Sequence, residues 1–139
     1  MHASAGMIGS TAACTATATR ATVHRFVADI DRGEASAAAQ LFAPEPLFQW
    51  YSTRAPGRRL GAQAYDRGTL ASYFKTRVRA REHLRLTELD ARYDAGRHIV
   101  NFSGTLVRTA DGLRSTSPHW FKGAAACMQF GPSIIVWSM

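Results

Sequence analysis

The first regular pattern along the chain is helical. Between Val23 and Ile30, apolar residues fall at i, i+3, i+4 and i+7, the spacing of an amphipathic helix that buries one face. Gly33 is a natural stop for this helix. An alanine-rich second helix then begins at Ser36 and buries side chains up to Phe42, until two prolines end it.

A short aromatic run and another helical pattern follow. Residues 47–52 are rich in aromatics and predict a strand. Residues 53–68 contain a proline, three glycines and no period, so we expect the longest internal loop there. From Leu70 to Val78 apolar residues recur at helical spacing, with Thr69 as the cap of a third helix.

The second half of the chain alternates between apolar and polar positions. Glycine-containing turns divide it into four predicted strands. These strands are expected over 83–93, 97–109, 118–128 and 133–138. Within the first of them the alternation shifts near Glu88, which predicts a bulge. Together the elements predict an α+β domain in which three N-terminal helices pack on a curved antiparallel sheet.

The composition agrees with a single folded domain. The chain has 139 residues, of which 46% are hydrophobic and 19% charged, enough apolar side chains for a core and too few charges for a disordered polyelectrolyte. Residues 1–20 are mostly small and predict a flexible tail or processing remnant, followed by one domain over 21–139. No apolar stretch is long enough to predict a transmembrane helix.

The positive charge of the chain is concentrated in one segment. Residues 54–85 carry nine basic and two acidic side chains, which accounts for the whole net charge of +7. The partner of this basic patch could be nucleic acid, an acidic protein, an anionic headgroup or solvent. The pattern favours a solvated face over a nucleic-acid interface, because nucleic-acid readers usually interleave exposed aromatics or a recognition helix with such a patch.

The two cysteines, Cys14 and Cys127, are too few for a disulfide framework or a zinc site. Small and apolar neighbours around Cys127 predict a buried, inert thiol. The amino-terminal segment has neither the basic start nor the apolar stretch of a secretory signal. A cytoplasmic location is therefore the default, with an extracytoplasmic one expected if a signal peptide precedes this sequence.

The order of elements and several hydrophobic runs together resemble a known superfamily. The runs are Leu41-Phe42-Ala43 followed by Phe48-Gln49-Trp50-Tyr51, the helix Leu70 to Val78, and the last strand, Ile134-Ile135-Val136-Trp137. Over about residues 20 to 139 the chain resembles the nuclear transport factor 2-like superfamily, most of all its SnoaL-like branch. The resemblance implies a cone-shaped domain whose helices and concave sheet face enclose a pocket, and a homodimer formed through the convex sheet surface.

The same resemblance selects candidate site residues. Asp90 or His119 would act as acid or base, with Tyr51 as a hydrogen-bond donor. The pocket would be lined by Trp50, Tyr73, Tyr93, Asn101, Ser103, Trp120 and Trp137. Isomerase-like relatives place a carboxylate just beyond the second helix, but here that position falls at residues 49–51, which include none. From the residues alone, Asp90 beside Arg92 is more typical of a surface pair, and His119 of a solvated or capping histidine.

Motifs for other chemistry are missing from the sequence. It contains no phosphate-binding loop, no nucleotide-binding glycine pattern and no nucleophile elbow. No two histidines stand at a spacing typical of metal ligands, so neither a metal nor another cofactor is expected.

Three functions remain open at this point. The first is a small-ligand-binding domain with an apolar pocket for an apolar or aromatic molecule. The second is an isomerase, dehydratase or cyclase that uses a pocket acid or base. The third is a dimeric interaction protein whose basic patch over 54–85 contacts an acidic partner. No motif in the sequence establishes turnover.

Overall fold

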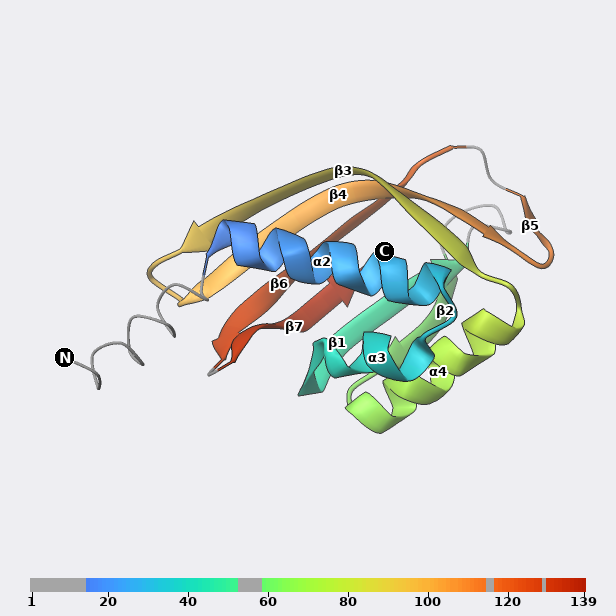
Figure 1. The fold of residues 1–139 in the computed structure, drawn as a ribbon, viewed down its shortest axis with the longest axis horizontal. Coiled ribbons are helices and arrows are strands. Elements are labelled where there is room, and N and C mark those ends of the chain that lie inside the picture. The colour runs from blue at the N-terminus through green and yellow to red at the C-terminus, as the bar shows by residue number, and fades with distance from the viewer. Residues whose placement is uncertain (1–14, 53–58, 115–116, 129) are drawn as a thin grey trace.

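The computed structural model describes residues 15–52, 59–114, 117–128 and 130–139. Its helices are α2 (Ala16–Asp31), α3 (Ala35–Gln40) and α4 (Arg67–Arg79). Its strands are β1 (Phe42–Ser52), β2 (Arg59–Ala64), β3 (His83–Asp94), β4 (Ile99–Ala110), β5 (Leu113–Arg114), β6 (His119–Met128) and β7 (Gly131–Ser138). The fold is α+β with a curved sheet, and its third described helix follows two strands (Figure 1).

The sheet joins strands that are far apart in the sequence. Its order is β2-β1-β7-β6-β4-β3, and β5 pairs with β4. All described neighbours are antiparallel except β1 and β7, which run parallel. The prediction of a wholly antiparallel sheet is therefore wrong at this one pair. A parallel pair needs a long crossover connection, and here most of the chain lies between the two strands.

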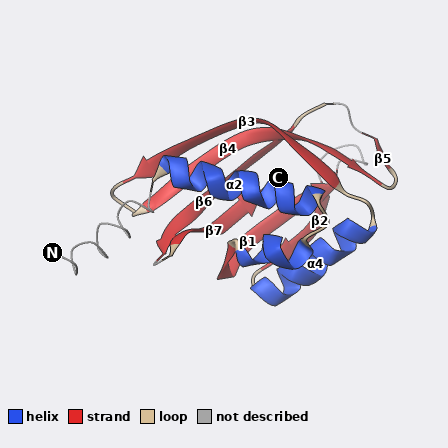
Figure 2. Cartoon of the chain, viewed as in Figure 1, coloured by secondary structure: helices blue, strands red, loops and turns tan. Residues whose placement is uncertain are grey.

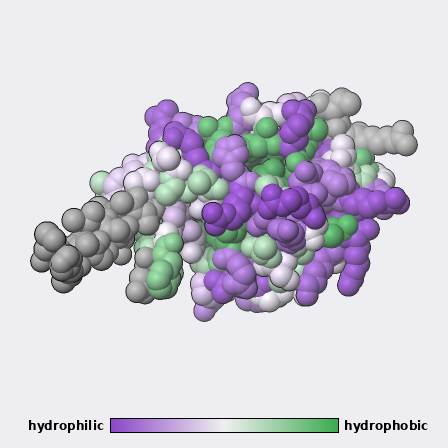
Figure 3. Space-filling model, in the orientation of Figure 1, coloured by the Kyte–Doolittle hydropathy of each residue, from purple (hydrophilic) through white to green (hydrophobic). Residues whose placement is uncertain are grey.

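The helices cover one face of this sheet, the inner face (Figure 2). Helix α2 packs against β3, β4 and β7, while α3 packs on α4 beside β1. The opposite side, the outer face, carries the alternate, exposed positions of the strands. Seen from the helix side, the surface is largely hydrophilic with smaller hydrophobic areas (Figure 3). None of the described helices has the length and apolar character needed to cross a membrane.

Helix α2 follows the predicted pattern. Its buried face includes Val23, Phe26 and Ile30, and Gly33 follows it with a φ of +80°, the left-handed conformation that glycine adopts at helix ends. The helix begins at Ala16, within the predicted tail, and Thr19 is already buried. Residues 1–14 of that tail lie outside the described residues.

The two prolines act differently from the prediction. Helix α3 ends at Gln40 and β1 begins at Phe42, so Pro44 and Pro46 lie inside a strand. The pairing of β1 with β7 is irregular between Phe42 and Leu47. A proline has no N–H to donate to a ladder, and this interrupted section of the strand tolerates it.

Strand β2 lies within the segment expected to be a loop. It pairs with the end of β1, with Trp50 opposite Ala62 and Gln49 opposite Gln63. The strand is short and has a glycine at its centre, so its sequence carries little alternation. By contrast, the predicted bulge near Glu88 is confirmed by a register shift between Leu86 and Glu88.

Cys127 differs from the expected free thiol, because it is disulfide-bonded. It lies near the end of β6 and is half-buried. Two cysteines are too few for a framework but sufficient for a single bridge. The other cysteine of the chain, Cys14, lies outside the described residues.

Aromatic rings fill the space between the helices and the inner face. The ring of Phe26 contacts Phe42 at a centroid distance of 5.2 Å and Trp137 at 4.9 Å. Phe74 of α4 contacts Phe26 and Phe48 at 5.4 and 5.5 Å. Buried aromatics contribute both apolar area and ring contacts to stability. This core ends toward Trp50, where polar side chains replace the rings.

Candidate functional site

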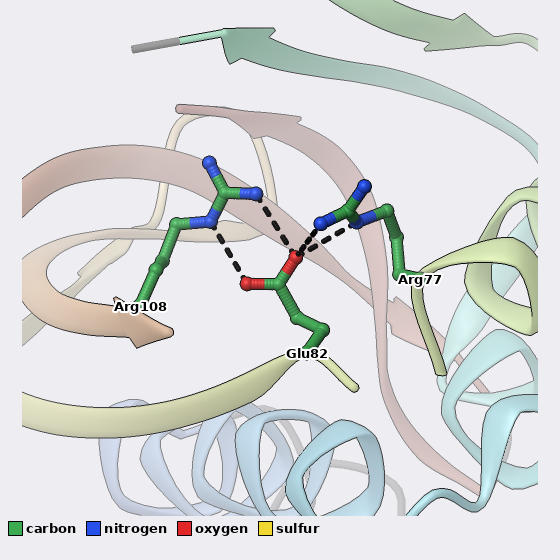
Figure 4. Close-up of polar contacts among 3 residues, drawn as sticks. All are labelled: Arg77, Glu82 and Arg108. Atoms are coloured by element: carbon green, nitrogen blue, oxygen red, sulfur yellow. Dashed lines mark hydrogen bonds and ion pairs between the residues drawn. The ribbon is translucent and has the colours of Figure 1, made fainter. Parts of the chain in front are cut away.

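A buried carboxylate between two arginines stands at the end of the aromatic core. Glu82, directly before β3, lies between Arg77 of α4 and Arg108 of β4 (Figure 4). Its Oε1 atom accepts from Arg77 Nε at 2.8 Å and from Arg108 Nη2 at 2.9 Å, and its Oε2 atom accepts from Arg108 Nε at 3.0 Å. The exposed fractions of the side chains are 0% for Glu82, 5% for Arg108 and 22% for Arg77.

The turn after α4 fixes the position of this carboxylate. At the start of the helix, Asp66 Oδ1 accepts from the Thr69 N–H at 2.7 Å, a side-chain cap. At its end, Arg81 has a φ of +57°, which is uncommon for a residue other than glycine. The Glu82 N–H donates to Arg77 O at 3.0 Å, so helix end and carboxylate stay together.

Trp50 forms the wall behind Arg108. The Arg108 guanidinium carbon lies 4.7 Å from the centroid of the Trp50 ring, in cation–π geometry. The same ring contacts Tyr73 at 6.0 Å and stacks on Phe48 at 5.7 Å. Trp50 is 2% exposed, and its Nε1 atom is a buried donor without a hydrogen-bond partner among the described residues.

Two half-buried ionisable groups lie in the field of this cluster. Burial raises the pKa of Tyr73 to about 12, against the opposing effect of Arg77 and Arg108, so its hydroxyl keeps its proton. Burial also lowers the pKa of His119, and the positive charge of Arg108 lowers it further, against the opposing effect of Glu82. The imidazole is therefore neutral at pH 7 and can accept a proton.

Three of the residues predicted for the site belong to this region. Trp50 and Tyr73 contact each other, and His119 lies on the inner face opposite Leu106, within the electrostatic reach of Arg108. We call Trp50, Tyr73, Arg77, Glu82, Arg108 and His119 the inner cluster. Trp137 lies deeper, stacked on Phe121 at 4.5 Å within the core.

Tyr51, the predicted hydrogen-bond donor, is half-buried next to Trp50 in β1. Its backbone N–H donates to Met139 O at 2.9 Å.

Four other candidates lie at the surface. Asp90 is exposed and accepts from Arg92 Nε at 3.1 Å. Asn101 and Ser103 are exposed on β4, and Trp120 is 70% exposed on β6. Strand neighbours point to opposite faces, so these residues share the outer face while Phe102 and Phe121 face the core.

Tyr93 is also exposed, and its hydroxyl lies 3.4 Å from His98 Nδ1. Among the described residues, no three His, Cys, Asp or Glu side chains gather into a metal site.

The three charged members of the inner cluster were not among the predicted site residues. Arg77 was predicted as part of the basic patch, and neither Glu82 nor Arg108 was given a role in a site. One signal existed for Arg108, because it continues the inward-facing series of β4 that includes Phe102 and Leu106. An arginine at an inward position predicts a buried partner.

The basic patch is not one continuous solvated face. Arg77 binds Glu82, and Arg67 donates to Phe42 O at 2.9 and 3.2 Å. Arg81 pairs with Asp111 at 3.1 Å, at the surface. Arg54 and Arg58 lie outside the described residues. At least two arginines of the segment thus make structural contacts within the chain and are not available as a solvated binding surface.

Two hollows have walls made of described residues. One, of about 520 Å³, lies on the outer face and includes Asp90, Asn101, Lys122 and Val136 in its lining. The other, of about 670 Å³, lies between α2 and the β6–β7 turn, beside the exposed Phe130.

Comparison with known proteins addresses the fold. The chain matches no protein-family model and no curated protein sequence. A nuclear transport factor 2-like protein with a cystatin-like fold from Novosphingobium aromaticivorans is similar with a TM-score of 0.63 at 12% identity, covering 86% of this chain and 77% of that one. A candidate scytalone dehydratase from the same organism gives 0.69 at 6% identity, covering 88% and 80%.

An uncharacterised protein with a cystatin-like fold from Caulobacter vibrioides gives a TM-score of 0.70 at 12% identity, covering 88% of this chain and 85% of that one. At such identities the similarity concerns the fold.

Proposed function

We propose that this chain, which has the nuclear transport factor 2-like fold, is a small-ligand-binding domain whose ligand contacts the inner cluster. The observation that carries the proposal is the Trp50 indole N–H, a buried donor that lies beside a buried ion cluster and has no partner in the part of the chain that the structure describes. An unsatisfied buried donor costs free energy, and a bound acceptor would recover it.

The surroundings of this donor have the character of a ligand site. Ligand sites combine apolar and aromatic walls with a few convergent polar groups. Here Trp50 and Tyr73 supply the rings, while Arg77 and His119 supply polar groups that are only partly buried. Because the aromatic core fills the space deeper inside, the ligand would enter between Tyr73, Arg77 and His119 and reach the Trp50 N–H and Arg108 behind them.

An acid–base enzyme is the second candidate, and the neutral imidazole of His119 favours it. A neutral histidine beside a protonated tyrosine can pass a proton to and from a ligand. Asp90, proposed from sequence for the same role, is on the outer face with Arg92. His119 is therefore the base that this version of the proposal requires.

We also propose that the outer face forms a homodimer interface. Apolar side chains of three adjacent strands, Leu47, Val136 and Ala124, stand side by side in the register of β1, β7 and β6. Trp120 adds a large exposed ring to the same face.

Binding can be tested by the NMR signals of the three tryptophan indole N–H groups. The probe is 2-naphthamide, a neutral aromatic amide, and the three signals are assigned with the variants Trp50→Phe and Trp120→Phe. We expect millimolar probe to shift the Trp50 signal, because a ligand at the inner cluster would accept from that N–H. The NMR spectrum of the recovered probe distinguishes simple binding from turnover, because an isomerised product would differ in structure but not in mass.

The Trp120 signal is the internal control, because Trp120 lies on the outer face. A shift of Trp120 alone would place binding on the outer face and contradict the proposal. A Trp50 signal unmoved both by this amide and by the corresponding carboxylate, 2-naphthoate, would refute ligand binding at the inner cluster.

A further inference from the structure

The inner cluster contains more positive than negative charge. It holds two guanidinium groups and one carboxylate, and the Oε1 atom of Glu82 is shared between both arginines. His119 is neutral at pH 7 and Tyr73 stays protonated, so neither changes this balance. A buried charge without a counter-charge is costly, so one elementary positive charge in this place calls for an anion.

No further acidic side chain of the chain pairs with Arg77 or Arg108. All ten of its acidic residues lie within the described segments. Six acids other than Glu82 form ion pairs with residues outside the cluster: Asp29, Asp31, Glu34, Asp90, Asp94 and Asp111. Asp66 caps α4, and the remaining two, Glu45 and Glu88, are exposed. None of these side chains therefore provides the counter-charge of the inner cluster.

Donors for such an anion remain in the cluster. The bonds to Glu82 use the Nε and Nη2 atoms of each arginine, and the Nη1 atom of each points away from the carboxylate (Figure 4). Arg77 is the partly exposed arginine, so its Nη1 atom is the one within reach of an arriving molecule. The Trp50 N–H, which no described residue accepts, is the second donor.

We infer that the ligand of the inner cluster is a small aromatic carboxylate. Its carboxylate would neutralise the excess charge of Arg77 and Arg108 and accept from the Trp50 N–H, while its ring would lie against Tyr73. Guanidinium groups bind carboxylates by charge-assisted hydrogen bonds, which are stronger than neutral ones. The inference rests on the proposed ligand-binding function and adds the chemical class of the ligand.

The experiment compares two probes of nearly equal shape, 2-naphthoate and 2-naphthamide, by titration of the Trp50 indole signal. We expect the carboxylate to bind at least about tenfold more tightly than the amide, the ratio that a single net charge-assisted bond supplies. In Arg77→Gln, which leaves Glu82 paired with Arg108, the ratio should fall to between about one and three. Arg79→Gln is the matched control, because Arg79 is exposed in the same helical turn.

Each outcome decides one of the two proposals. Equal affinity for the two probes, or tighter binding of the amide, overturns the inference while leaving ligand binding intact; water around Arg77 would then supply the compensation. If the preference for the carboxylate disappears both in Arg79→Gln and in high salt, it arises from the surface charge, and the inference is also overturned. If neither probe shifts the Trp50 signal, the proposed function itself falls.

Discussion

A single carboxylate determines the electrostatics at the end of the core. Glu82 is fully buried, and its hydrogen bonds to Arg77 and Arg108 compensate the loss of hydration. Replacing such ion clusters with apolar residues is often neutral for stability, whereas removing one member leaves a buried charge without a partner. The cluster is therefore better explained by the positions that it imposes on α4, β3 and β4 than by a gain in stability.

At the same scale, the neutral state of His119 predicts a pH dependence. Burial and Arg108 lower the folded-state pKa of the imidazole below its ordinary value of 6.5. Between these two values the unfolded chain binds a proton that the folded chain does not, so the free energy of unfolding falls as the pH decreases through this window. Urea unfolding above and below pH 6.5 should show this loss, and His119→Gln should remove part of it.

The control for that measurement is His24→Gln, because His24 is exposed on α2. If His119→Gln and the parent chain lose the same stability on acidification, His119 does not contribute to the pH dependence.

Individual site residues could be predicted only where the local sequence pattern determines on which face of a helix or strand their side chains lie. Trp50 and Tyr73 were selected from sequence, and they contact each other in the inner cluster. Glu82 could not be selected, because its burial depends on the left-handed turn at Arg81 and on an arginine 26 positions later in the chain. Long-range partners of this kind leave no periodic signal.

At the scale of elements, close approaches between strands leave no room for a side chain at Gly123. A Cβ atom added at Gly123 of β6 would collide with Val136 O of β7 and with the Phe102 ring of β4. Glycine at this position lets the Phe102 ring cover the strand, so the aromatic core reaches across β6.

We therefore expect Gly123→Ala to reduce the free energy of unfolding by about 1–3 kcal/mol, the usual cost of overpacking a core. Chemical denaturation monitored by circular dichroism measures this. Gly96→Ala is the control, because an added Cβ there makes only an ordinary contact, 3.5 Å from Asp94 Oδ1. Equal stabilities of the two variants would show that the β6 backbone can move away.

Elements with a strong period were predictable, and those defined by distant pairing were not. The apolar stripe of α2 and the bulge in β3 were found because each leaves a local pattern. The start of β1 at Phe42 was missed because its prolines resemble a helix end. Strand β2 was missed because its pairing with β1 defines it, and its short glycine-containing sequence has no alternating pattern that predicts a strand.

At the scale of the whole molecule, the proposed homodimer has a direct test. Light scattering after size-exclusion chromatography should give twice the monomer mass at micromolar concentration, because the outer face offers apolar side chains and a shallow hollow to a second copy. Trp120→Lys should shift the equilibrium toward the monomer, since it places a charge on this face. Phe130→Lys, beside the hollow at the β6–β7 turn, is the control.

A monomer mass for the parent chain, or equal dissociation by both variants, would count against the outer face as the interface.

The position of β7 has a consequence for biosynthesis. This strand bridges β1 and β6, so without it the sheet would divide into the pair β1–β2 and the group formed by β6, β4 and β3. In a nascent polypeptide emerging from the ribosome, the continuous sheet therefore cannot form before residues 131–138 have left the exit tunnel, and only helix packing can hold its two groups of strands together. Until then, the edges of β1 and β6 that pair with β7 lack their neighbour.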